Sequence, residues 1–149
     1  CLLRVDTTDG RHGYGECAPL PSHGSESHAA AATALQDWCR TLPGRDVHEA
    51  LAGLEADAAT NAAPATRAAV ECALLDLAAQ AAGVPLRRLL APAAGDAVAV
   101  NAMAGDVLGA TPERIDALLA EGYRVIKLKL GTADAASEIA ALRQLAGAL

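Results

Sequence analysis

The stretch Ala97–Gly131, AVAVNAMAGDVLGATPERIDALLAEGYRVIKLKLG, decides the fold of the second part of this chain. Its opening residues, 97–103, are mostly aliphatic and typical of a strand, and residues 111–122 have the pattern of a capped helix. A second strand follows over 123–131, and residues 134–149 are again helical in pattern. The order strand, helix, strand, helix predicts parallel βα units.

The N-terminal part has a different pattern, in which helices follow a hairpin. Residues 1–17 are predicted to form this hairpin, with Asp9-Gly10 supplying a turn that takes positive φ. The segment 18–27, APLPSHGSES, is rich in Pro, Ser and Gly and is expected to be a loop. We expect Ser25 to cap the next helix and Glu26 to lie in its first turn.

The clearest helix begins at Pro64 and ends at Gly83, which is a natural residue just past a helix end. We therefore divide the chain into a mixed α+β segment, residues 1–93, and the start of an α/β segment, residues 94–149. The chain opens in a strand pattern and stops inside a helical pattern, so we expect a fragment of a longer protein.

Composition limits the classes of function. The chain is 52% hydrophobic with a net charge of −6, and it has no basic run, so we do not expect a nucleic-acid partner. No apolar stretch is long enough for a membrane span, and no signal peptide is seen. The spacing of the cysteines and histidines predicts no metal site and no disulfide, as in a reducing cytoplasm; these residues are Cys1, Cys17, Cys39, Cys72, His12, His23, His28 and His48.

Two lysines lie in an otherwise aliphatic strand. Because strand side chains alternate, Lys127 and Lys129 share one face with Val125. The other face is apolar and is expected to lie under helices; it carries Ile126, Leu128 and Leu130. In a (β/α) barrel the lysine face points inward, and active sites lie at the carboxyl ends of the strands.

The spacing of the lysines predicts acid–base chemistry. Residues i and i+2 of a strand are about 6.6 Å apart, where two positive charges repel by roughly 2.5 kcal/mol at an effective dielectric of about 20. This repulsion, together with partial burial, favours a neutral amine on one lysine, which can then take a proton. The alternative is an edge strand that lysines protect from aggregation.

Three motifs in order along the chain resemble those of the enolase superfamily, in its muconate-lactonizing-enzyme subgroup. They are DGRHGYGECAPLP (9–21), AVECALLDLAAQAAGVPLRRLL (69–90) and GYRVIKLKLG (122–131). Within that subgroup they are most similar to o-succinylbenzoate synthase, although Glu71 stands where many members carry Leu.

The resemblance implies a capping domain over residues 1–93, without its first strand, followed by a modified (β/α) TIM-type barrel of which 94–149 forms the first two βα units. It implies Lys129 as the base that removes a proton next to a carboxylate, and Lys127 as its cationic neighbour. It also implies that the capping loop contacts the substrate, through Ser22, His23 and Gly24.

The resemblance further implies Mg²⁺, with ligands on barrel strands beyond residue 149 and none in this fragment, which alone is expected to be inactive. Acidic residues on the helical patterns are expected to face solvent: Glu113, Asp116, Glu121, Asp134 and Glu138.

The function favoured by the resemblance is an o-succinylbenzoate synthase-like lyase of menaquinone biosynthesis, which removes a proton and then eliminates water in syn geometry. The alternatives in the same superfamily are an N-acylamino acid racemase, a dipeptide epimerase or a muconate-type cycloisomerase. An alternative of another class is a non-catalytic module in which the two lysines bind an anion. The expected partner is a small-molecule carboxylate, and members of the superfamily often form homo-oligomers.

Overall fold

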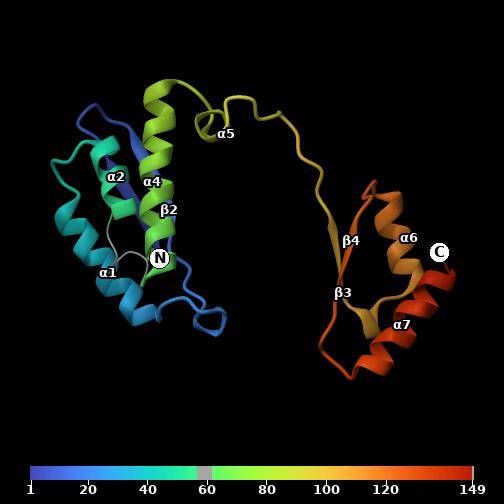
Figure 1. Ribbon diagram of the computed structural model, residues 1–149. Helices are drawn as coiled ribbons and strands as arrows, with labels where there is room; N and C mark the ends of the chain where they lie inside the picture. The colour runs from blue at the N-terminus through green and yellow to red at the C-terminus, as the bar shows by residue number, and fades with distance from the viewer. Residues whose placement is uncertain (57–61, 149) are drawn as a thin grey trace. The chain divides into compact units, whose positions relative to one another are not determined.

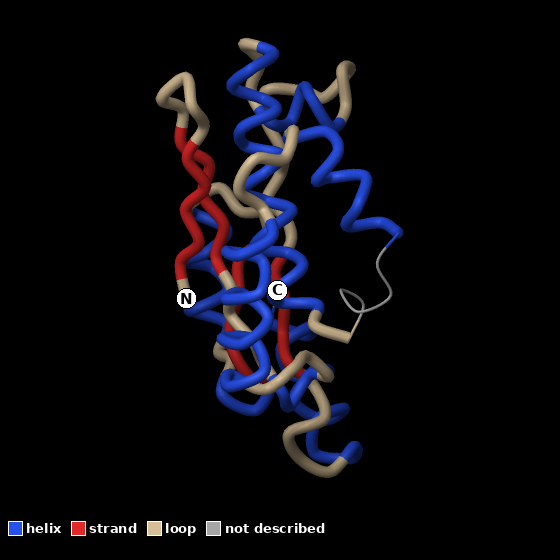
Figure 2. The backbone as a smooth tube through the Cα atoms, turned by 90° about the vertical axis from the view of Figure 1, so that its left-hand side faces the viewer, coloured by secondary structure: helices blue, strands red, loops and turns tan. Residues whose placement is uncertain are grey.

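The computed structural model describes residues 1–56 and 62–148, and the chain divides into two compact units, Cys1–Ala94 and Gly95–Leu149. In the first unit, strands β1 and β2 form an antiparallel hairpin in which Leu3 lies opposite Gly15 (Figures 1 and 2). Gly10 has a φ of 87° in the turn, as the Asp-Gly pair predicts. The elements of this unit are β1 (Leu2–Asp6), β2 (His12–Glu16), the short 3-10 helix η1 (Pro21–His23), α1 (His28–Thr41), α2 (Val47–Ala56), α4 (Pro64–Ala82) and α5 (Leu86–Leu90).

Helix α4 packs across the hairpin and forms the centre of the first unit (Figure 1). It begins at Pro64 and ends before Gly83, whose φ of 66° closes the helix, as predicted from sequence. Contact is close because Gly13 and Gly15 of β2 lack side chains where they meet the backbone of Ala73 and Ala69. The buried residues around this contact include Leu3, Cys17, Ala31, Leu35, Ala50, Leu54, Val70 and Leu74.

The second unit is a parallel βα arrangement, again as predicted. Strands β3 and β4 are parallel neighbours, and the core lies on one side of them, where Val107, Ile115 and Leu145 are buried. The elements are β3 (Ala102–Asp106), η2 (Val107–Gly109), α6 (Pro112–Ala120), β4 (Ile126–Lys129) and α7 (Ala135–Ala148).

Two boundaries differ from those expected from the sequence. The first strand of the second unit begins at Ala102 and not at residue 97, because only from Ala102 onward does β4 supply a hydrogen-bonding partner. Val98 and Val100 before it are exposed. In the first unit, α1 is capped by Ser27, whose hydroxyl accepts from the Ala30 N–H, so the prediction of Ser25 as the cap is wrong.

Within the described ranges, no helix combines the length and apolar character needed to cross a bilayer. All four cysteines are unpaired thiols, and Cys17 alone among them is buried.

The close approach of β2 and α4 can be tested by adding one methyl group. We expect Gly15→Ala to lower the free energy of unfolding of the first unit by at least about 2 kcal/mol, because its Cβ would overlap the carbonyl of Ala69. Urea unfolding followed by the fluorescence of Trp38, the only tryptophan, measures this. Gly53→Ala within α2 is the control: its nearest neighbour is 3.9 Å away, and we expect a gain of about 0.5–1 kcal/mol. Equal behaviour of both variants would contradict the packing argument.

Candidate functional site

Lys127 and Lys129, the only lysines of the sequence, lie on one face of β4. Both side chains are exposed, whereas Ile126 and Leu128 are half-buried against the core of the second unit. The alternation predicted for these four residues is therefore confirmed. Leu130, expected on the buried face, is instead 53% exposed, because β4 ends at Lys129 and the chain turns at Gly131.

The partial burial expected for the two amines is not found. In the described part of the second unit, the helices pack on the opposite face of the sheet, and the lysine face is open. Water therefore screens the repulsion between the amines more strongly than a dielectric of about 20 would.

The register of the parallel sheet places an acidic residue opposite the second lysine. Met103 of β3 pairs with Lys127, and Asp106 pairs with Lys129. Between these pairs β3 has one residue more than β4, and Gly105, with a φ of 82°, takes up the extra residue as a bulge. Asp106 was not anticipated from the sequence, because a bulge cannot be located from the alternation of a strand.

The loop after β4 is held by Glu138 of α7. Its carboxylate accepts hydrogen bonds from the backbone N–H groups of Gly131, Thr132 and Ala133, at 2.9, 2.9 and 3.1 Å. The Thr132 hydroxyl donates to it as well, and only 6% of the residue is exposed. These backbone N–H groups, with Gly131 and Thr132 contributing most, hold the pKa of Glu138 below its ordinary value.

The expectation that Glu138 faces solvent is wrong. The helix begins just after Asp134, whose carboxylate accepts from the backbone N–H and the hydroxyl of Ser137. A glutamate in the first turn of such a helix can reach back to unpaired N–H groups before it. The Asp134–Ser137 pair signals where the helix begins, but it does not signal which N–H groups Glu138 binds.

The predicted substrate loop forms the 3-10 turn η1 in the first unit. Ser22 and His23 are exposed, and the Ser22 hydroxyl lies 3.1 Å from Nδ1 of His23. Gly24 follows with a φ of 90°, and its N–H donates to the carbonyl of Pro21. The Ser25 hydroxyl accepts from the Leu20 N–H, which closes the turn.

Glu26 anchors this loop to the start of α4. Its carboxylate accepts from the Ala65 N–H at 3.1 Å, and from the N–H and hydroxyl of Thr66 at 2.7 and 2.8 Å. Burial alone would raise the pKa of Glu26, but these hydrogen bonds outweigh it and the pKa is lowered. Glu26 therefore lies before α1 and binds the start of α4, whereas it was expected in the first turn of α1.

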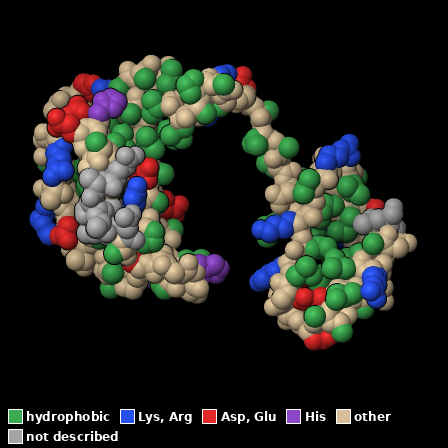
Figure 3. Space-filling view, viewed as in Figure 1, with side chains coloured by type: hydrophobic (Ala, Val, Ile, Leu, Met, Phe, Trp, Pro, Cys, Tyr) green, Lys and Arg blue, Asp and Glu red, His purple; other side chains and the backbone are tan. Residues whose placement is uncertain are grey.

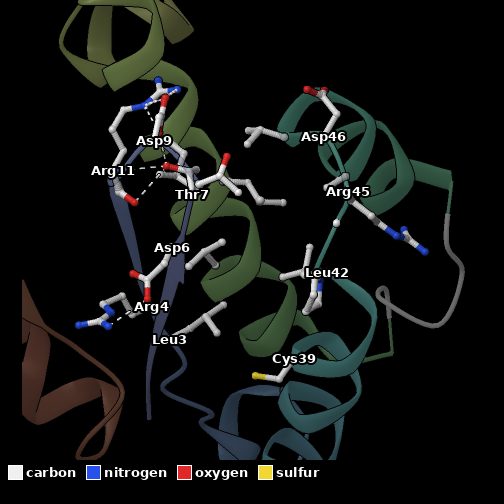
Figure 4. Close-up of a pocket in the computed structure, with 18 residues that line it drawn as sticks. Leu3, Arg4, Asp6, Thr7, Asp9, Arg11, Cys39, Leu42, Arg45 and Asp46 are labelled. Atoms are coloured by element: carbon white, nitrogen blue, oxygen red, sulfur yellow. Dashed lines mark hydrogen bonds and ion pairs between the residues drawn. The ribbon is translucent and has the colours of Figure 1, made fainter.

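A cavity of about 650 Å³ lies between β1, the start of α2 and the segment that joins α1 to α2 (Figure 4). Its floor is apolar, and on its rim Arg4 pairs with Asp6 and Arg11 pairs with Asp9. None of the residues predicted to form the site lines it. On the face drawn in Figure 3, basic side chains are scattered among acidic, polar and apolar ones.

Among residues 1–56 and 62–148, no cluster of three or more His, Cys, Asp or Glu side chains is arranged to bind a metal ion. The described residues therefore do not fit a Mg²⁺ site.

The mixed α/β unit and the parallel βα unit that follows it agree with the resemblance to the enolase superfamily. Residues 1–91 match the N-terminal domain of the mandelate racemase/muconate lactonizing enzyme family, and the chain belongs to this family. The first unit is accordingly the N-terminal capping domain.

Three proteins of known identity are similar over most of the chain. A hydrophobic dipeptide epimerase of Roseobacter litoralis is 35% identical over 128 residues, 86% of this chain and 36% of its own length. A cis-3-hydroxy-L-proline dehydratase of Roseibium aggregatum is 33% identical over 133 residues, 87% of this chain and 36% of its own. The crystal structure of a Methylococcus capsulatus dipeptide epimerase with Mg and the dipeptide L-Arg-D-Lys has a TM-score of 0.82 at 33% identity, over 99% of this chain and 42% of its own.

The chain thus spans well under half the length of these relatives. None of the three is an o-succinylbenzoate synthase, so the synthase favoured from the sequence is not supported. The epimerase that was its alternative is supported better.

The anchoring of the loop by Glu26 gives a pH-dependent prediction. We expect Glu26→Gln to lower the free energy of unfolding of the first unit at pH 7 by about 2 kcal/mol, because several hydrogen bonds to a charged acceptor are weakened. Since the pKa is lowered in the folded state, this contribution is full above the ordinary value of 4.5 and is lost as pH falls through the folded pKa.

The measurement is urea unfolding by Trp38 fluorescence at pH 7 and at progressively lower pH. Glu49→Gln, an exposed glutamate of α2, is the matched control and should change stability by less than about 0.5 kcal/mol. A difference between wild type and Glu26→Gln that stays constant down to about pH 2 would contradict the assignment.

Proposed function

We propose that this chain belongs to an enzyme that removes and returns the proton next to a carboxylate, as an epimerase of dipeptides or related acylated amino acids. The observation that carries the proposal is the pair of amines on one face of β4, at the carboxyl end of the strand. The two dipeptide epimerases among the relatives support the same reaction class.

In this proposal Lys129 is the base. Its neutral Nζ takes the α-proton and becomes an ammonium, and the electron pair of the C–H bond moves into the carboxylate to form an enediolate. A second acid returns the proton on the opposite face of the carbon, as an epimerase requires. Lys127 and Lys129 are the only lysines of this sequence, so this second acid is not a further lysine among its 149 residues. Lys127 contributes a fixed positive charge beside the base.

Two charged side chains are the neighbours of Lys129 in the sheet. Lys127 lies on the same face of β4, and Asp106 of β3 is paired with Lys129.

The capping loop supplies the substrate contacts in this proposal. Ser22, His23 and Gly24 offer a hydroxyl, an imidazole and a backbone turn on the exposed surface of η1. The anchoring of Glu26 keeps these groups in a fixed turn, which suits recognition of one end of a small carboxylate substrate.

We further propose that the second unit forms the first two βα units of a modified TIM-type barrel. In the same proposal, a further strand precedes β1 in the capping domain. The crystal structure of the similar dipeptide epimerase contains Mg, which supports Mg²⁺ as the cofactor. The ion would stabilise the enediolate. Its ligands would lie on later strands, and no role of this chain's residues depends on it.

A second candidate is a lyase of the same superfamily, in which proton removal is followed by loss of water. The relative that dehydrates cis-3-hydroxy-L-proline favours this reading over the non-catalytic anion-binding module. The shared first step assigns the same role to Lys129.

The role of Lys129 is tested in the full-length protein with Mg²⁺ present. We expect Lys129→Ala to reduce turnover by on the order of a thousandfold or more while the circular dichroism spectrum stays unchanged, because the proton acceptor is removed. Arg124→Ala removes an exposed cation just before the same strand and should leave activity within about twofold. Near-normal turnover of Lys129→Ala would exclude it as the base.

The role of Lys127 is tested by the pH dependence of kcat/KM. We expect Lys127→Ala to lower activity and to shift its rise to higher pH, because the neighbour that disfavours a second positive charge is lost. Profiles that superimpose on the wild type would refute the electrostatic coupling.

The substrate class is tested by assaying the full-length protein with apolar dipeptides, N-succinyl amino acids and the cyclohexadiene precursor of o-succinylbenzoate. The proposal expects inversion of a dipeptide or acylated amino acid. Turnover of the precursor alone would establish the synthase instead.

A further inference from the structure

Packing fixes the carboxyl end of β4 only up to Leu128, which is half-buried against the core of the second unit. Leu130, directly after Lys129, is 53% exposed. On the side of β3 the ladder is interrupted by the bulge at Gly105, so the pairing of Lys129 with Asp106 is irregular. Lys129 is therefore the last residue of β4, at the point where packing against the core stops.

Glu138 supplies the missing constraint. Two residues after Lys129 the chain turns at Gly131, and three successive backbone N–H groups point to the Glu138 carboxylate. The glutamate is itself fixed, because it is buried in the first turn of α7 and its N–H donates to the carbonyl of Asp134. The end of β4 is therefore tied to the start of α7 through one side chain.

The charge of the carboxylate matters to this arrangement. Three converging N–H groups form a concave site of positive potential, which an anion fills best. A neutral amide of the same size presents one oxygen and one NH₂ group, so at least one of the N–H groups would face a donor. The shorter aspartate keeps the charge but reaches less far.

We propose that Glu138 is a positioning residue for Lys129, which holds the strand end so that Nζ meets the α-carbon of the substrate from one face. This inference rests on the proposed role of Lys129 as a base. A lysine side chain is long and flexible, so its reach to a carbon acid depends on where its backbone is fixed. Displacements of about 1 Å from such a position can cost about a hundredfold in rate.

The test uses the two faces of the substrate carbon. The full-length protein is incubated in D₂O with Mg²⁺ and either Ala-Leu or its epimer at Leu, and loss of the α-proton signal is followed by NMR. In an epimerase each epimer loses its proton to a different residue, so Lys129→Ala identifies the epimer that Lys129 serves. A positioning role affects that epimer alone, whereas a general loss of structure affects both.

We expect Glu138→Gln to slow exchange of the Lys129-dependent epimer by about 10- to 100-fold, mainly in kcat, while exchange of the other epimer stays within about threefold. Glu138→Asp should recover part of the loss, because it restores the charge. Glu121→Gln, an exposed glutamate at the end of α6, is the matched control and should leave both rates unchanged.

Hydrogen exchange of the backbone amides gives a readout that does not depend on catalysis. In Glu138→Gln the amides of Gly131, Thr132 and Ala133 should lose protection, while those in the middle of α7 keep theirs.

The outcomes separate the two proposals. Exchange of both epimers by Lys129→Ala at the wild-type rate would overturn the proposed base and this inference with it. If Lys129→Ala abolishes exchange of one epimer, the proposed base stands. The positioning role alone is then overturned if Glu138→Gln slows both epimers equally or slows neither. Unchanged protection of residues 131–133 would also overturn it.

Discussion

Hydrogen bonds from backbone N–H groups to a buried or half-buried glutamate determine where both loops of interest lie. Glu26 binds the first N–H groups of α4 and thereby fixes the turn that carries Ser22 and His23. Glu138 binds the N–H groups that follow Lys129. In each case the anion satisfies donors that a helix start or a tight turn leaves without partners, which is why one residue can fix a whole segment. The chemistry proposed for each unit depends on a structural carboxylate close by in the chain.

The first unit depends on a second constraint, the absence of side chains at two positions of β2. Gly13 and Gly15 let α4 approach the hairpin until backbone meets backbone, and small residues of α4 complete the contact. Alanine-rich helices bury little area per residue, so close approach compensates for the lack of large aromatic side chains in this sequence. This close contact holds α4 against the hairpin in the capping domain. The loop that contains Glu26 is in turn positioned by its hydrogen bonds to the start of α4.

Membership of the mandelate racemase/muconate lactonizing enzyme family agrees with the motifs seen in the sequence, but the choice within the family changed. The preference for a synthase came from the similarity of the three sequence motifs, and the relatives do not support it. The similarity to the two dipeptide epimerases covers 86% and 99% of this chain and so extends over both units. The epimerase and the lyase proposed for this chain share the removal of the first proton and differ in the step that follows it.

The sequence by itself determined the hairpin, the long helix from Pro64 to Gly83 and the parallel βα order, because glycine turns, capping residues and hydrophobic periods are local properties. It also determined that Lys127 and Lys129 share a face, since the alternation of a strand follows from its geometry. Only the tertiary structure decided that Glu26 caps α4, that Glu138 holds residues 131–133 and that Asp106 lies opposite Lys129. Those contacts depend on which segments meet in space and on one bulge at Gly105, and neither is encoded in the local pattern.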